Sequence, residues 1–87
     1  MFDITDIKIR IVNADSKLKA VASIVIDDCI AIHDIKILDG EGGDFISMPS
    51  RKTPDGNFRD VVHPINSDAR EKIKNMVFSA YRQALLK

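Results

Sequence analysis

Isoleucine alternates with polar residues early in the chain, and this period of two constrains the fold more than any other feature of the sequence. Residues 7–11 read Ile-Lys-Ile-Arg-Ile, as in a strand that buries one face. The cluster at 13–17, Asn-Ala-Asp-Ser-Lys, is typical of a turn, and the alternation resumes over residues 18–26. The two runs therefore predict an antiparallel hairpin.

A second tight turn is predicted at residues 27–28, Asp-Asp, and an isoleucine-rich third strand is predicted over residues 29–38. The apolar positions of this strand change parity between Ile32 and Ile35. Because successive side chains of a strand point to opposite faces, the change indicates either a β-bulge at His33-Asp34 or a strand that is buried on both faces.

The middle of the chain is rich in turn-forming residues. The glycine-rich acidic stretch 39–44 lacks the spacing of a phosphate-binding loop and is expected to be a flexible turn. Short strands are predicted over residues 45–48 and at residues 61–62. Between them, residues 50–60 are predicted to form a polar loop, in which Thr-Pro-Asp-Gly at 53–56 is a strong turn signal.

A helix is predicted over residues 67–86, with Ser67 as its N-cap. Two apolar stripes run along this helix: Ile73, Met76, Val77, Ala80 and Ala84 form the first, and Phe78, Tyr81 and Leu85 form the second. We expect the first stripe to pack on the sheet. The second stripe is expected to pack on another copy of the chain, or else under loops of the same chain.

The 87 residues are expected to form one α+β domain. Its parts are a sheet at 1–49, a basic loop with a short strand at 50–66 and the helix at 67–86, giving an antiparallel sheet of four to five strands with a C-terminal helix. A core of this size is marginal, which favours a homodimer. No apolar run approaches the roughly 20 residues that cross a bilayer, and no signal peptide is recognised. With Cys29 as the only cysteine, these features favour a cytoplasmic protein.

Charge is unevenly distributed along the chain, although the net charge is zero. Residues 1–49 carry five bases and nine acids, whereas residues 50–87 carry eight bases and four acids. Such asymmetry is typical either of a polyanion-binding face or of a salt-bridged surface with uneven sequence order.

Basic side chains concentrate in the predicted loop and at the start of the predicted helix. The residues that could converge on a phosphate are Arg51, Lys52, Ser67, Arg70 and Lys74. Guanidinium and ammonium groups neutralise phosphates, and a helix N-terminus adds backbone donors. The alternative is a solvated loop in which Arg59 pairs with Asp55 or Asp60.

Carboxylates neighbour imidazoles at His33-Asp34 and at Asp60 and His63, and a cysteine and several serines are also present. No nucleophile-elbow, cysteine-nucleophile or metal-ligand motif accompanies them. We therefore expect structural histidines, and neither an enzyme, a metal site, a cofactor nor a small-molecule substrate.

Residues 48–67, Met-Pro-Ser-Arg-Lys-Thr-Pro-Asp-Gly-Asn-Phe-Arg-Asp-Val-Val-His-Pro-Ile-Asn-Ser, resemble the signature stretch of the SpoVG family of septation regulators (stage V sporulation protein G). Residues 4–10, 22–27 and 32–35 fit the same pattern, so the resemblance covers almost the whole chain. It implies an antiparallel sheet with a C-terminal helix, in a small dimeric regulator that binds DNA, and RNA in some members. It also implies effects on septation, sporulation and gene expression, without enzymatic activity or a cofactor.

The resemblance also implies a binding site in the basic loop and at the helix start. The matching positions are Arg51, Lys52, Ser67 and Arg70, where Arg51-Lys52 reverses the order commonest in the family but keeps both charges. Charge and helical geometry add Arg59, Lys72 and Lys74, and the expected dimer contacts are Phe78, Tyr81 and Leu85.

The expected function is therefore that of a nucleic-acid-binding regulator that grips phosphates with the basic loop and the helix start. The alternative is a protein-interaction module that regulates cell division without nucleic-acid contact. Such a module would use the second apolar stripe or the acidic N-terminal half. Neither expectation includes contact with a membrane.

Overall fold

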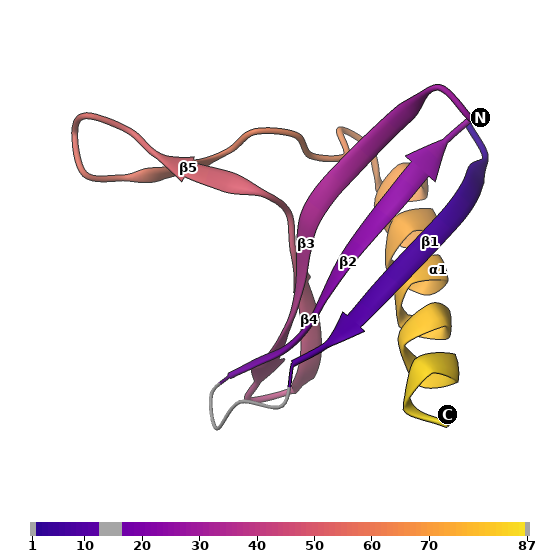
Figure 1. Ribbon diagram of the computed structural model, residues 1–87. Helices are drawn as coiled ribbons and strands as arrows, with labels where there is room; N and C mark the ends of the chain where they lie inside the picture. The colour runs from indigo at the N-terminus through magenta and orange to yellow at the C-terminus, as the bar shows by residue number, and fades with distance from the viewer. Residues whose placement is uncertain (1, 13–16, 87) are drawn as a thin grey trace.

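The alternating runs pair with their neighbours in sequence to make one antiparallel sheet (Figure 1). The computed structural model describes residues 2–12 and 17–86. The strands, in their order across the sheet, are β1 (Ile4–Ile11), β2 (Leu18–Ile26), β3 (Ile30–Gly40) and β4 (Gly43–Ser47). The α+β class and the antiparallel sheet are confirmed. The turn predicted at 13–17 falls mainly on residues 13–16, which lie outside the described residues.

The predicted turn between β2 and β3 is confirmed. Asp27 and Asp28 have φ values of 52° and 54°, as both central residues of a type I′ turn require. The backbone N–H of Cys29 donates to the carbonyl oxygen of Ile26 at 3.0 Å and closes the turn. Aspartate tolerates this left-handed conformation better than most residues other than glycine.

The parity change in β3 is a β-bulge. Ile24 of β2 pairs with Ile32, whereas Ala22 pairs with Ile35, so β3 contains one extra residue in this interval. Asp34 adopts a φ of 63° there. The extra residue returns the isoleucines on both sides of it to the same face of the sheet, where they are buried.

A single helix, α1 (Ser67–Leu85), covers one face of the sheet (Figure 1). The residues that form the buried core are Ala20, Ala22, Ile24, Ile32, Ile35, Ile37, Ile73, Val77 and Tyr81. The helical members of the core lie four residues apart, in one row along the helix.

The predicted division of the helix into two stripes is wrong in one respect. Tyr81, expected to face a second chain, is only 8% exposed and belongs to the core of its own chain. Met76, expected in the core, is 39% exposed. The residues that face the sheet follow a spacing of four, and Met76 lies three positions after Ile73, beside that row.

The helix N-cap is Asn66. The prediction of Ser67 as the N-cap is wrong by one residue. Asn66 has extended backbone angles, φ −144° and ψ 164°, and its side chain accepts a hydrogen bond from the Ala69 N–H at 2.8 Å. Ser67 is the first helical residue, and Asp68 follows in the first turn, where its charge favours the positive end of the helix dipole.

Residues 50–60 form a hairpin, where the sequence predicts a loop. Strands β5 (Ser50–Lys52) and β6 (Phe58–Asp60) pair in a sheet of their own. We call residues 50–60 the arm; in Figure 1 it extends to the left, away from α1. The strand predicted at residues 61–62 is not formed. The Val61 N–H donates to the Pro49 carbonyl oxygen at 2.8 Å, but proline has no N–H with which to continue the ladder.

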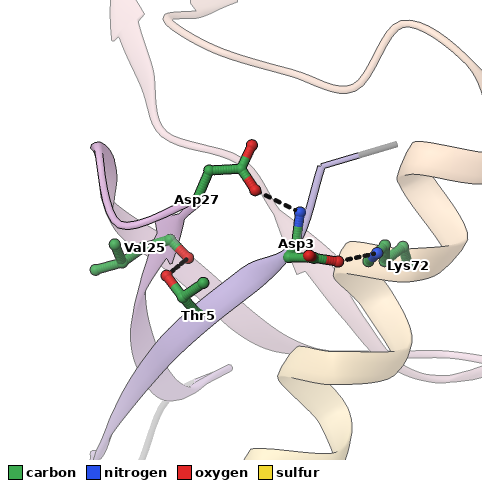
Figure 2. A network of polar contacts seen from close by, with 5 residues as sticks. All are labelled: Asp3, Thr5, Val25, Asp27 and Lys72. Carbon is green, nitrogen blue, oxygen red and sulfur yellow. Dashed lines mark hydrogen bonds and ion pairs between the residues drawn. The ribbon is translucent and has the colours of Figure 1, made fainter.

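Polar contacts hold the start of β1 against the β2–β3 turn and against the helix (Figure 2). The Asp3 N–H donates to Oδ1 of Asp27 at 2.9 Å, and the Asp3 carboxylate lies 3.5 Å from Nζ of Lys72. Thr5 Oγ1 donates to the carbonyl oxygen of Val25 at 3.4 Å. These contacts join the N-terminal segment to both layers of the fold.

The cap assignment predicts unequal effects of two neighbouring substitutions. Asn66→Ala should lower the free energy of unfolding by about 0.5–2 kcal/mol, because the Ala69 N–H loses its acceptor. Ser67→Ala is the matched control, and it should change the free energy by no more than about 0.5 kcal/mol. Urea unfolding followed by circular dichroism measures both values, and a larger loss for Ser67→Ala would contradict the assignment.

Candidate nucleic-acid interface

The arm places two guanidinium groups opposite each other. Arg51 and Arg59 are cross-strand partners, and Lys52 is the partner of Phe58. Directly opposed residues of an antiparallel pair project from the same face, with Cβ atoms about 4.5–5.5 Å apart. One face of the arm therefore carries both arginines, and the other face carries Lys52 beside Phe58, which is 70% exposed.

The bases of the arm are not paired with its two acids, Asp55 and Asp60. Among the described residues, the ion pairs join Lys19 to Asp44 at 3.3 Å and Lys72 to Asp3 at 3.5 Å, and neither involves a base of the arm. The pairing of Arg59 with Asp55 or Asp60, considered from the sequence, is thus not formed. Like charges directly opposite each other destabilise a strand pair, so the arginine pair has a cost in the free protein.

Asp55 is engaged within the turn at the arm's tip. Its carboxylate accepts hydrogen bonds from Thr53 Oγ1, from the Asn57 N–H at 3.2 Å and from Asn57 Nδ2 at 3.3 Å. These donors, the Thr53 hydroxyl foremost, lower the pKa of the Asp55 carboxyl below its ordinary value of 3.8. The charge of Asp55 therefore holds the turn together.

Two further candidate bases line an open cavity between α1, β4 and the root of the arm. Arg70 and Lys74, one helical turn apart, border this cavity of about 540 Å³ together with Asp44 and Asp60. Asp44 hydrogen-bonds to Lys19 and raises the pKa of that ammonium group. Its charge is therefore shared with a residue outside the cavity.

The other two helix candidates have different surroundings. The Lys72 ammonium lies 5.4 Å from the centre of the Phe2 ring and forms the ion pair with Asp3. It is therefore held at the N-terminal end of β1. Ser67 is exposed in the first turn of the helix, next to the capping Asn66.

The structure thus groups Arg51 with Arg59, and Arg70 with Lys74, but it does not bring the two groups together. In Figure 1, β5 extends away from α1, and the cavity beside Arg70 and Lys74 is bordered by Asp60 of the arm but by none of the arm's bases. Within a single chain, the predicted bases therefore do not all converge on one phosphate. Each chain instead presents two basic surfaces.

The position of Arg59 opposite Arg51 is the feature that sequence reasoning missed. The turn signal at residues 53–56 could have revealed it. In a hairpin centred on Asp55, Arg51 and Arg59 are each four residues from the centre and therefore lie opposite each other. Sequence charge alone identified Arg59 without its partner.

The histidines and the cysteine considered for catalysis lie at separate places in the fold, and each histidine ring has a hydrogen-bonding neighbour of its own. His33 Nδ1 lies 3.1 Å from Ser23 Oγ, and His63 Nδ1 lies 3.2 Å from the Pro64 carbonyl oxygen. Cys29 is exposed at the β2–β3 turn. Across residues 2–12 and 17–86, no group of three potential metal ligands is found. In the same residues, no helix has the length and apolar character needed to cross a membrane.

Acid should loosen the tip of the arm. Because the folded arm lowers the pKa of Asp55, its ionised carboxylate stabilises the turn above the unfolded-state pKa. This stabilisation is lost as the pH falls through the lower folded-state value. We expect the Asp55 carboxyl carbon to titrate below pH 3.8 by NMR, and the Asn57 amide to exchange faster in acid. In Asp55→Asn this pH dependence should disappear; a carboxyl midpoint at or above 3.8 would argue against the turn geometry.

Comparison with known proteins places the whole arrangement in one family. A model of the SpoVG family matches residues 2–83, which include the sheet, the arm and most of the helix. A relative from Agathobacter rectalis is 57% identical over 79 residues, covering 91% of this chain and 91% of the relative. One from Clostridium botulinum (strain Alaska E43 / Type E3) is 50% identical over 82 residues, covering 94% and 90%. One from Brevibacillus brevis is 51% identical over 79 residues, covering 91% and 83%.

All three relatives carry the name "Putative septation protein SpoVG". The matches extend over both basic surfaces of the structure, and each relative is covered over more than four-fifths of its length. This chain belongs to the SpoVG family.

Proposed function

We propose that the protein is a cytoplasmic, homodimeric nucleic-acid-binding regulator that influences septation and gene expression, and that the arm is its main contact with DNA. The name shared by its relatives supports the role in septation. The proposal of nucleic-acid binding rests mainly on the opposed pair Arg51 and Arg59. Both side chains are exposed, and neither has a carboxylate within 4 Å among the described residues.

The shape of the arm suits a groove of double-stranded DNA. The major groove is about 12 Å wide and admits a two-stranded β-ribbon. In such a groove, Arg51 and Arg59 reach phosphates or the O6 and N7 atoms of guanine, which arginine binds with two hydrogen bonds. Lys52, on the other face of the ribbon, reaches the opposite wall. In an RNA duplex, whose major groove is deep and narrow, the same groups reach phosphates only.

The helix start supplies the second contact. Arg70 and Lys74 border the cavity beside the root of the arm, and Ser67 lies about one turn before Arg70. A homodimer doubles both surfaces, so that two arms and two helix starts contact one nucleic acid. Lys72, bound to Asp3 in the free chain, contributes only after leaving that partner.

Exposed apolar side chains at the end of the helix support the homodimer. Leu85 is 55% exposed, and Phe78 is half-buried at the cavity. We propose that both contact the second chain. Tyr81 lies in the core of its own chain, where Phe78 packs against the same core. It therefore supports the proposed interface from below without touching the second chain.

Neutralising the arm should weaken binding and flatten its salt dependence. Arg51→Ala/Lys52→Ala removes two phosphate contacts, so the slope of log K against log salt for duplex DNA should become shallower by about 1.8, at about 0.9 per contact. Gel shifts at several salt concentrations measure the slope. Lys17→Ala removes a base outside both surfaces and is the control, with an unchanged slope expected.

Equal affinity and slope for the arm variant and the wild type would refute the role of the arm. Absence of nucleic-acid binding by the wild-type chain, with protein partners that persist in pull-downs after nuclease treatment, would instead favour the protein-interaction module. Circular dichroism melting confirms that each variant is folded.

The proposed dimer contact is tested by adding a charge to it. Leu85→Lys should lower the sedimentation coefficient to that of a monomer, because a lysine at the subunit contact must lose its hydration. The neighbouring Leu86 is 85% exposed at the helix C-cap, and Leu86→Lys is the control that should leave the dimer intact. Dimeric sedimentation of Leu85→Lys would contradict the placement of the interface.

A further inference from the structure

The second face of the four-stranded sheet carries basic side chains that belong neither to the arm nor to the helix start. The helix α1 packs on one face only (Figure 1). We call the other face the outer face. The cross-strand register gives its central residues as Lys8, Arg10, Val21, Ser23, His33 and Lys36. Lys8, Arg10 and Lys36 all belong to residues 1–49, which carry more acids than bases, so the charge pattern of the sequence did not indicate them.

Three bases lie close together on the outer face. Val21 of β2 pairs with Arg10 on one side and with Lys36 on the other, which places these two bases about 10 Å apart at the usual strand spacing. Their long side chains can converge above the shorter Val21 between them. Lys8 lies two residues before Arg10 on β1, opposite Ser23.

These bases form no ion pair among the described residues. The two ion pairs among the described residues, at Lys19 and Lys72, leave Lys8, Arg10 and Lys36 without a carboxylate within 4 Å. All three side chains are exposed to solvent.

The β-bulge adds hydrogen-bond donors to the same place. The extra residue in β3 directs His33 toward Ser23, whose Oγ lies 3.1 Å from Nδ1 of the imidazole. If the serine hydroxyl donates in this bond, the ring keeps an Nε2–H donor; if the ring donates, the hydroxyl hydrogen is free. In either tautomer one donor remains for an anion.

A shallow groove connects Lys8 and Arg10 with the His33–Ser23 pair, and Lys36 lies outside its lining. It has a volume of about 400 Å³ and is bordered by Lys8 and Arg10 on β1, by Ser23 on β2, and by His33 and Asp34 on β3. Neither phenylalanine nor tyrosine borders this groove within the described residues, so it offers charge and donors to phosphates and no large ring on which bases stack.

We propose that the outer face is a second phosphate-binding surface, which takes the sugar-phosphate backbone of a nucleic acid through Lys8, Arg10 and Lys36. This second surface adds a contact to the proposed function, and its assignment to a nucleic acid rests on that function. The His33–Ser23 pair donates a hydrogen bond to a phosphate oxygen beside these bases. Asp34 borders the same groove, and its negative charge limits the affinity.

Two variants with opposite expected effects test this surface. Arg10→Gln/Lys36→Gln removes two positive charges and keeps side chains of similar length. Asp34→Asn removes the negative charge, and asparagine accepts the left-handed backbone at this position. Both sites are exposed, and thermal unfolding of each variant confirms the fold.

The first measurement uses inorganic tripolyphosphate, so that it does not depend on DNA binding. In NMR titrations of the wild-type chain, we expect amide shifts at Arg10, Ser23, His33 and Lys36. The apparent dissociation constant at these amides should rise several-fold in Arg10→Gln/Lys36→Gln and fall in Asp34→Asn. Shifts confined to the arm and the helix start would overturn the inference.

The second measurement uses duplex DNA and separates the two proposals. Arg10→Gln/Lys36→Gln should make the slope of log K against log salt shallower by about 0.9 for each lost contact, with the arm unaltered. If only the arm variant changes the slope, the outer-face surface is wrong and the proposed function stands. If the wild type binds no nucleic acid but tripolyphosphate still shifts the outer-face amides, the proposed function is wrong and the anion surface stands.

Discussion

The packing of one helix on one face of the sheet is the contact on which the rest of the structure depends. Ala20 and Ala22 of β2 are fully buried in the core that α1 shares with the sheet. This interface supplies most of the apolar burial that offsets the loss of chain entropy on folding. Within residues 2–12 and 17–86, the one helix lies on the other face of the sheet, so the bases of the outer face and of the arm stay exposed.

The arm shows how little structure is needed to position a charged pair. Its strands have three residues each, and its contacts are largely its own: the ladder of β5 with β6 and the turn in which Asp55 is bound by Thr53 and Asn57. The opposed arginines destabilise this ladder in the free protein. In the proposed complex, a phosphate between them would remove that repulsion, and the hairpin would gain stability on binding. The acid that holds the turn is hydrogen-bonded there and not paired with either arginine.

The sequence predicted those elements whose side chains alternate over several residues. β1, β2, the Asp27-Asp28 turn and the bulge in β3 all follow from the spacing of isoleucines, because a buried face enforces that spacing. The arm has exposed strands, so no burial pattern marks it. Asn66 and Ser67 are both good capping residues, and only the extended backbone at Asn66 decides between them. Tyr81 was misplaced because apolar residues three and four apart look alike in sequence, whereas the sheet contacts one row.

A net charge of zero does not weaken the case for phosphate binding, because the attraction of a phosphate depends on the charged groups near it. The carboxylates of Asp3, Asp44 and Asp55 are each engaged by an ion pair or a hydrogen bond. The turn between β2 and β3, which contains Asp27 and Asp28, lies on the opposite side of the view from the arm in Figure 1. At physiological ionic strength, charges separated by more than about 8 Å on the surface are largely screened from each other. A phosphate at the arm or on the outer face is therefore attracted by the bases next to it, and the balance of the whole chain has little influence.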